Sequence, residues 1–345
     1  MYEFIKLPKS DREAAFRIAS TYTGYPAHVV EKDFWVTYLL DTLFNRLTHT
    51  HRLMFKGGTS LSKCYKLIER FSEDIDLSLN MEDLGFGGDK APHEIAKLPE
   101  SKKKAEKAVE LLKLAGEAFL RDTLLPMLSD QITADIGSAK EWSLSIDPNN
   151  PENILFLYPK SLNTSEYGDQ YVKPVVLIES GTKAAHEPIE RVEIKAFIED
   201  AIAEIKTSCE VNVLSPKRTF WEKATILHAE NNINKPDRVK ERLSRHLYDL
   251  VMLYRSDIGK EALKDTDLLA KVAEHKKFYF RSGAANYDDA KPGTLKIVPH
   301  YAILQAFKQD YEKMGSMFSG EILSFDAIIS ELTQLENSIN SFVSE

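Results

Sequence analysis

The chain has 345 residues, of which 43% are hydrophobic and 28% are charged, and its formal net charge is −8. This is the composition of an ordinary globular protein, long enough for two or three packed regions. The negative balance argues against a dedicated binder of duplex DNA, because phosphate contacts dominate that affinity and favour basic proteins. The sequence has no apolar run of about 18 residues that could cross a membrane. Asp11 and Glu13 lie where a signal peptide would be apolar, so we expect a cytoplasmic protein.

The first 215 residues mix helical and strand periodicity. Apolar residues at helical spacing predict helices over residues 11–20, 28–46, 60–70 and 99–127. Strands are expected over residues 52–55, 71–80, 142–146, 154–158, 175–178 and 211–214. The continuous apolar run at 175–178 is typical of a strand buried on both faces. These patterns predict an α/β (α+β) core with a mixed sheet over residues 1–215.

The remaining sequence is dominated by helical patterns. Helices are expected over residues 217–230, 237–255, 260–274, 299–314 and 322–341. Residues 216–345 are therefore predicted to form a mainly helical C-terminal domain that closes over a cleft of the core.

The most informative stretch is a glycine turn after the strand expected at residues 52–55. Gly57 and Gly58 let the backbone turn sharply and let a large anion approach closely. Thr59 and Ser60 can cap the following helix and offer hydroxyl groups to a phosphate. Because the helix N-terminus adds a partial positive charge at the same place, the turn predicts a phosphate cradle.

Two aspartates follow this turn in the next predicted strand. Asp74 and Asp76 are two residues apart, so both carboxylates point to one face of that strand. Such close like charges are unfavourable unless a cation lies between them. A hard divalent ion such as Mg²⁺, which leaves room for substrate phosphates, meets that need. A phosphate cradle followed by paired aspartates indicates phosphoryl transfer.

Each part of this motif also has a plain structural interpretation. The glycine turn can precede an ordinary helix, and Asp74 and Asp76 can lie on the solvent face of an edge strand. Lys56, Lys63 and Arg70 flank the turn, where they can meet phosphates or be solvated. The order of strand, glycine turn, helix and Asp-x-Asp strand favours the functional interpretation, in which Lys63 contacts the nucleotide.

These motifs resemble those of the AbiEii/AbiGii-type nucleotidyltransferases, a family of the polymerase-β-like superfamily. The resemblance is carried by residues 57–63 (GGTSLSK) and 70–77 (RFSEDIDL), supported by 30–36 (VEKDFWV), 218–223 (RTFWEK), 245–250 (RHLYDL) and 310–314 (DYEKM). It implies that Asp74 and Asp76 bind Mg²⁺ or Mn²⁺ and that an NMP passes from an NTP to an acceptor hydroxyl, releasing pyrophosphate. Many family members are toxins of type IV toxin–antitoxin or phage abortive-infection systems, with a cognate antitoxin that need not form a stable complex.

The resemblance also gives roles to residues of the later motifs. Lys223 would contact the nucleotide phosphates, as suits a compact point charge, although it can equally be a surface lysine. Asp249 would complete the catalytic site by positioning metal or acceptor. Because Asp249 lies in an apolar helix, it needs a partner. Arg245, four residues earlier, either forms an ordinary helical ion pair with it or faces the cleft beside it and binds nucleotide.

A third carboxylate on a neighbouring strand is common in this superfamily. Glu179, after the apolar run at 175–178, is the natural candidate metal ligand, unless it only marks where the strand reaches the surface. Glu193 is a weaker candidate, because its surroundings resemble a surface helix or loop.

The acceptor is the least determined part of the prediction. Family members modify an RNA, such as a tRNA end, or sometimes a protein. Residues 275–281 (HKKFYFR) interleave basic and aromatic side chains, a pattern that can bind RNA or form an aromatic plug in the core. The sequence thus favours RNA. A non-toxic enzyme with another acceptor and a catalytically idle nucleotide-binding protein are the alternatives, and the intact Asp74 and Asp76 argue against the second.

Overall fold

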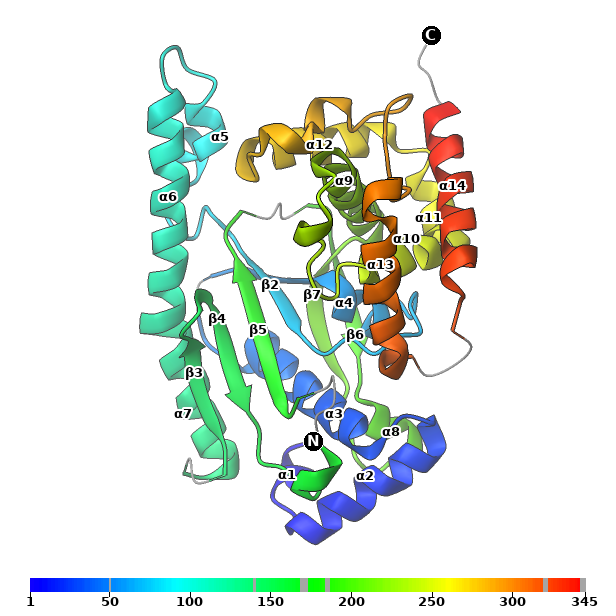
Figure 1. Ribbon diagram of the computed structural model, residues 1–345. Helices are drawn as coiled ribbons and strands as arrows, with labels where there is room; N and C mark the ends of the chain where they lie inside the picture. The colour runs from blue at the N-terminus through cyan, green and yellow to red at the C-terminus, as the bar shows by residue number, and fades with distance from the viewer. Residues whose placement is uncertain (50, 139–140, 168–172, 184–186, 319–321, 342–345) are drawn as a thin grey trace. The chain divides into compact units, whose positions relative to one another are not determined.

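The computed structural model describes residues 1–49, 51–138, 141–167, 173–183, 187–318 and 322–341 (Figure 1). The chain forms two compact units. The first contains Met1–Cys64 and Phe71–Leu214, and the second contains Tyr65–Arg70 and the described residues from Ser215 onward. The six residues Tyr65–Arg70 therefore leave the first unit between two of its central elements.

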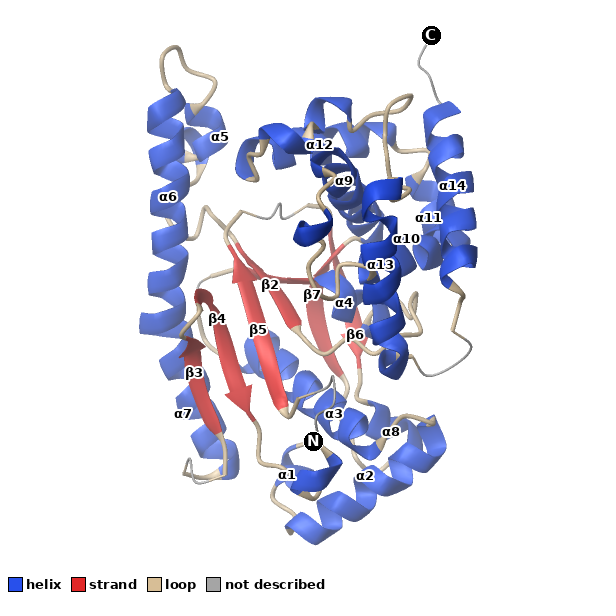
Figure 2. Ribbon diagram, viewed as in Figure 1, coloured by secondary structure: helices blue, strands red, loops and turns tan. Residues whose placement is uncertain are grey.

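The first unit is built on a mixed sheet, which has seven strands in the described residues, in the order β3-β4-β5-β2-β1-β7-β6 (Figure 2). The pairs β2–β5 and β1–β7 are parallel, and the other neighbours are antiparallel. The strands are β1 Leu53–Lys56, β2 Ile75–Leu79, β3 Ser143–Asp147, β4 Asn150–Leu157, β5 Val175–Gly181, β6 Ile189–Ile194 and β7 Cys209–Leu214. Since β2 lies at the centre of the sheet, the edge-strand interpretation of Asp76 is wrong.

Helices flank this sheet, and α3 packs against both β5 and β7. Every residue of α3 from His28 to Leu40 is buried, including three consecutive charged side chains at positions 31–33. The helices of this unit are α1 Tyr2–Ile5, α2 Lys9–Thr23, α3 Ala27–Asp41, α4 Gly57–Lys63, α5 Pro92–Ile95, α6 Lys102–Phe119, α7 Leu125–Ile136 and α8 Phe197–Ala201. Shorter 3₁₀ or π-helical turns are η1 Thr42–Arg46, η2 Gly88–Lys90, η3 Leu120–Leu124 and η4 Thr164–Glu166.

The second unit is helical in its described residues, apart from one isolated bridge between Arg70 and Phe318 (Figure 2). Side chains of Ser256 and Asp265 cap the starts of α11 and α12. Its helices are α9 Pro216–Ile233, α10 Arg245–Arg255, α11 Asp257–Ala262, α12 Thr266–Tyr279, α13 Tyr301–Lys313 and α14 Phe325–Ser341. Its short turns are η5 Pro236–Arg238, η6 Gly283–Ala285, η7 Tyr287–Asp289 and η8 Met314–Met317.

The predicted α/β fold, with a mixed sheet and a mainly helical C-terminal region, is confirmed. Three local predictions are wrong. The helix expected over residues 60–70 ends at Lys63. The strand β5 alternates between buried and partly exposed residues, so it is not buried on both faces. The helix expected over 237–255 begins only at Arg245. In the described part of the chain, no helix is long and apolar enough to cross a membrane.

Candidate active site

A row of polar side chains crosses the middle of the sheet in the first unit. Lys56 of β1 is paired in register with Asp76 of β2, which is paired with Glu179 of β5, which in turn is paired with Asn153 of β4. Residues directly opposite one another in neighbouring strands point to the same face. The two carboxylates therefore come from strands roughly 4.8 Å apart. Asp74, one residue before β2, is expected on the same face by alternation.

Gly57 places the start of α4 directly against the carboxylate of Asp76. Its φ of +80° lies in the left-handed region, which favours glycine. A Cβ atom at this position would lie 1.8 Å from Asp76 Oδ2 and 2.5 Å from Cγ. Glycine is therefore required here both for its backbone conformation and for the close approach of the carboxylate.

Gly57→Ala is expected to lower the free energy of unfolding by roughly 2 kcal/mol or more, because the left-handed conformation alone costs an L-residue about 1–2 kcal/mol. Displacement of the Asp76 side chain adds to that cost. Gly24→Ala is the matched control, since Gly24 has a φ of +77° but an added Cβ would have nothing within 4 Å. Urea unfolding of both variants measures the difference. Equal losses of stability would contradict the close packing of Gly57 on Asp76.

Thr59 and Ser60 are both fully buried, and their hydroxyl groups point into the protein. The hydroxyl of Thr59 donates to the carbonyl oxygen of Asp74 at 2.5 Å, and that of Ser60 donates to the carbonyl oxygen of Gly57 at 2.9 Å. Neither side chain caps α4, so that prediction is wrong. The reason is that α4 begins at Gly57, three residues earlier than expected, which places Thr59 inside the first turn. Thr59 instead links the glycine turn to Asp74.

Lys63, a predicted nucleotide contact, forms a buried ion pair in this structure. Its side chain is only 4% exposed, and its ammonium lies 2.6 Å from Asp33 Oδ1. The ammonium also lies 5.3 Å from the centre of the Phe197 ring. Lys63 therefore joins the end of α4 to α3, and its contact with the nucleotide stays a prediction.

The carboxylates of the sheet suit a hard divalent cation, although the described residues contain no group of three or more His, Cys, Asp or Glu side chains placed to bind a metal. Asp74, Asp76 and Glu179 are partly exposed. They supply the oxygen donors that Mg²⁺ prefers, and Mg²⁺ usually keeps waters and substrate phosphates in its remaining positions. Asp76 lies in register between Glu179 on one side and Lys56 on the other. Asp76 and Glu179, which lie in register, therefore offer the type of oxygen donor that a divalent ion prefers, and their role as metal ligands stays a prediction.

A second charged cluster lies within the second unit. Asp249 of α10 is fully buried and accepts hydrogen bonds from both Arg70 and Lys223. Arg70 Nε lies 2.7 Å from Asp249 Oδ1, and Arg70 Nη2 and Lys223 Nζ each lie 2.7 Å from Oδ2. The predicted partner Arg245 is partly exposed on the first turn of α10. The predicted Arg245–Asp249 pair is thus replaced by a triad whose third member is Arg70, which was expected to meet phosphates or to be solvated.

The electrostatics of this triad show a surplus of positive charge. Burial acts to raise the pKa of Asp249, but Arg70 and Lys223 together hold that pKa below its usual range. Burial also lowers the pKa of Lys223, and repulsion from Arg70 and Arg245 adds to this effect against the attraction of Asp249. The lowered pKa of Asp249 thus reflects the two cations that contact it, whereas the lowered pKa of Lys223 comes first from burial. Three cations, Arg70, Lys223 and Arg245, interact with the single carboxylate of Asp249 or with one another here.

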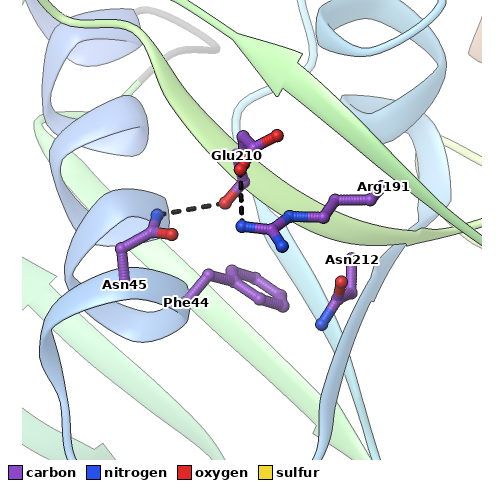
Figure 3. Close-up of a pocket in the computed structure, with 5 residues that line it drawn as sticks. All are labelled: Phe44, Asn45, Arg191, Glu210 and Asn212. Atoms are coloured by element: carbon purple, nitrogen blue, oxygen red, sulfur yellow. Dashed lines mark hydrogen bonds and ion pairs between the residues drawn. The ribbon is translucent and has the colours of Figure 1, made fainter.

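A pocket of about 180 Å³ lies elsewhere in the first unit, beside β6 and β7 (Figure 3). It is lined by Phe44, Asn45, Arg191, Glu210 and Asn212. Two polar contacts order its lining: Asn45 Nδ2 donates to the carbonyl oxygen of Glu210 at 3.0 Å, and Arg191 forms an ion pair with Glu210. None of the predicted site residues lines it, so the pocket is separate from the row of carboxylates.

Comparison with known proteins finds a family whose model covers residues of both units. The family model described as nucleotidyl transferase AbiEii toxin, type IV toxin–antitoxin system, matches residues 38–331. The chain belongs to the AbiEii nucleotidyltransferase toxin family. The match spans the glycine turn, the Asp74–Asp76 pair and the three later motifs at residues 218–223, 245–250 and 310–314. No curated relative matches the chain significantly.

Among solved structures, the chain is similar to MenT4, a nucleotidyltransferase toxin from Mycobacterium tuberculosis H37Rv. The two share 15% sequence identity with a TM-score of 0.42, over 98% of this chain and 100% of that chain.

Proposed function

We propose that this AbiEii-family protein transfers an NMP from an NTP to an acceptor hydroxyl. The acceptor oxygen attacks the α-phosphorus, the bond from that phosphorus to the bridging oxygen breaks, and pyrophosphate leaves while the hydroxyl proton passes to solvent. The observation that carries the proposal is the pairing of Asp76 with Glu179 in the sheet, with Gly57 packed on the Asp76 carboxylate.

In this proposal, Asp74, Asp76 and Glu179 hold Mg²⁺ or Mn²⁺. The metal ion would supply charge neutralisation at the phosphates and activation of the hydroxyl. Gly57 and Gly58 are partly exposed, and the backbone of this turn is the proposed place where a phosphate approaches.

The cationic residues of the second unit are the proposed binders of the triphosphate. Lys223 supplies a point charge, and the surplus of positive charge around it favours an anionic ligand. Arg245, partly exposed on the same helix as Asp249, is the proposed second contact.

An RNA, such as a tRNA end, is the acceptor that we favour. The end of α12 exposes 48% of Phe280, and Lys276 lies 5.8 Å from the centre of that ring. Arg281 lies 5.2 Å from the centre of the Phe278 ring. An exposed aromatic ring beside cations can stack on an unpaired base while the cations contact the backbone. Tyr279 between them is buried, so this segment serves partly as a core plug.

In the cell, we propose that the protein is the cytoplasmic toxin of a type IV toxin–antitoxin or phage-defence system. Its antitoxin would act without forming a stable complex.

A transfer assay tests the chemistry and the acceptor together. The full-length protein is incubated with each α-labelled NTP, Mg²⁺ and total bacterial RNA, beside an Asp74→Ala/Asp76→Ala variant. We expect label in RNA with the native protein, none with the variant, and loss of activity in EDTA that excess Mg²⁺ restores.

Other outcomes of this assay would change the proposal in defined ways. Label in protein instead of RNA would keep the transferase and replace the acceptor. Bound NTP without any transfer would favour the idle nucleotide-binding protein. Transfer that persists in EDTA or in the aspartate variant would contradict the metal site.

A further inference from the structure

The triad Arg70–Asp249–Lys223 suggests how one cation of the site is oriented. Arg70 and Asp249 form a bidentate pair, because two guanidinium nitrogens reach separate carboxylate oxygens, each at 2.7 Å. Lys223 Nζ shares Oδ2 with the guanidinium, at 2.7 Å. The side chains of Arg70 and Asp249 are 1% and 0% exposed, and that of Lys223 is 6% exposed.

The carboxylate of Asp249 is therefore committed to these cations. Both of its oxygens accept charge-assisted hydrogen bonds in a site that excludes solvent. Binding a metal ion or accepting a proton would require breaking at least one of these bonds, and breaking a buried charge pair is costly. This geometry does not suit the expected role of Asp249 in positioning metal or acceptor. It suits a carboxylate that fixes the position of Lys223.

Arg70 is itself held against α10 by contacts on both sides. The backbone N–H of Glu69 donates to the hydroxyl of Tyr248 at 3.2 Å, so successive residues of the 65–70 segment contact successive residues of α10. Arg70 also forms a backbone bridge with Phe318. A lysine cannot reproduce its planar two-bond contact.

We propose that Arg70 is a positioning residue that orients Asp249 and, through it, presents the ammonium of Lys223 to the phosphates of the NTP. This inference rests on the proposed function for the identity of the ligand. Arg70 also contributes charge. While it compensates Asp249, the positive charge of Lys223 stays available to an anion; without it, Asp249 and Lys223 would neutralise each other.

A double-mutant cycle distinguishes positioning from general structural support. The variants are Arg70→Ala, Lys223→Ala and the double variant, with Arg70→Lys as the conservative change. If Arg70 acts through Lys223, its removal costs nothing further once Lys223 is absent. The matched control is Arg255→Ala. Arg255 is an exposed arginine of α10, the helix that carries Asp249, and it pairs with Glu331 of α14.

Each full-length protein is measured for NTP dissociation constant and for transfer rate, both normalised to the folded fraction found by urea unfolding. We expect both single alanine variants and the double variant to bind NTP about 10-fold more weakly than the native protein, with no additional loss in the double variant. Arg70→Lys should lose most of the same affinity for NTP, because lysine keeps the positive charge but cannot form the bidentate contact with Asp249. Arg255→Ala should bind like the native protein.

Several results would overturn the positioning role. Additive losses of NTP affinity in the double variant would show that Arg70 acts independently of Lys223. Native NTP affinity in Arg70→Lys would show that the bidentate contact with Asp249 is unnecessary. If Arg70→Ala does not fold, the cycle is run with Arg70→Lys and Lys223→Ala, and the same criterion applies. If the variants bind NTP as expected but the native protein transfers no label to any acceptor, the proposed reaction is refuted and the positioning role remains. Absence of NTP binding by the native protein would refute both.

Discussion

Asp76→Asn is expected to slow nucleotidyl transfer by about 10³-fold, because charge stabilisation by a metal ion contributes several kcal/mol and ~4 kcal/mol corresponds to that factor. Asparagine has almost the same shape as aspartate, so it still fits against Gly57, where an added Cβ would overlap Oδ2 of Asp76. The loss should therefore arise from the missing charge and not from the fold. Single-turnover rates at saturating NTP, together with a Mg²⁺ titration, measure it.

Glu179→Gln extends this test to the neighbouring strand. Glu179 is paired in register with Asp76, so we expect a smaller but clear loss of at least about 10-fold, partly recovered at high Mg²⁺. Glu193→Gln is the matched control. Glu193 is an exposed carboxylate on the edge strand β6, where it is paired with Glu210. If Asp76→Asn retained native activity, or if Glu179→Gln behaved like Glu193→Gln, the carboxylate row would not be the metal site.

Local sequence patterns predicted the elements that carry the carboxylates. The alternation of Ile75, Leu77 and Leu79 with polar residues located β2, and the glycines located the turn before α4. These signals succeed because side-chain periodicity and the conformational freedom of glycine are properties of neighbouring residues. The position of Gly57 against Asp76 follows from the same short stretch of chain.

Contacts between distant residues could not be predicted in this way. Arg70 and Asp249 are 179 positions apart in the chain, and the register of Asp76 with Glu179 depends on which strands become neighbours. Lys63 is a predicted nucleotide contact because its sequence neighbours are glycines and hydroxyl residues. Its ion-pair partner, Asp33, comes from α3, which is separated from the turn by η1 and β1.

Errors in element boundaries have particular physical causes. The helix expected over 237–255 starts late because Arg242 adopts a φ of +67°, and because Asp310 accepts hydrogen bonds from the backbone N–H groups of Arg242 and Ser244. The strand β6 escaped prediction because four of its six residues, Ile189–Arg191 and Glu193, are exposed, which leaves no clear apolar alternation. Glu193 therefore lies in a strand, not in the expected surface helix or loop.

The sequence shows three consecutive charged residues in α3, but it does not show which residues they contact. Glu31, Lys32 and Asp33 are all buried, and each contacts a different segment of the first unit. Glu31 accepts a hydrogen bond from the backbone of Ser161, Lys32 pairs with Glu73, and Asp33 pairs with Lys63. A run of three charged residues inside an apolar helix is a signal of buried ion pairs, since lysine and acidic residues are almost never fully buried unless paired.

Lys32→Met is expected to lower the free energy of unfolding of the first unit by about 3–5 kcal/mol, because breaking a buried ion pair leaves its partner without the compensating charge. Lys32 Nζ lies 2.9 Å from Glu73 Oε2, and the two side chains are 2% and 5% exposed. The same ammonium donates to the carbonyl oxygen of Lys173 at 2.9 Å. Lys6→Met is the control, since Lys6 pairs with Glu3 at the surface with the side chains 54% and 91% exposed, and it should change stability by less than about 0.5 kcal/mol.

The measurement has to report the first unit alone, since two compact units need not unfold together. In a Trp221→Phe background, the remaining tryptophans, Trp35 and Trp142, both lie in the first unit. Their fluorescence during urea unfolding gives the stability of that unit for each variant.

The double variant Lys32→Met/Glu73→Leu separates charge from packing. Replacing both members of a buried pair by apolar residues is often neutral or stabilising, so we expect it to recover most of the stability lost in Lys32→Met. Because Glu73 directly precedes Asp74, recovered stability with reduced transfer would mean that the pair also fixes the strand proposed to bind the metal. Equal instability of the single and double variants would instead show that packing around Lys32, and not its charge, stabilises this part of the sheet.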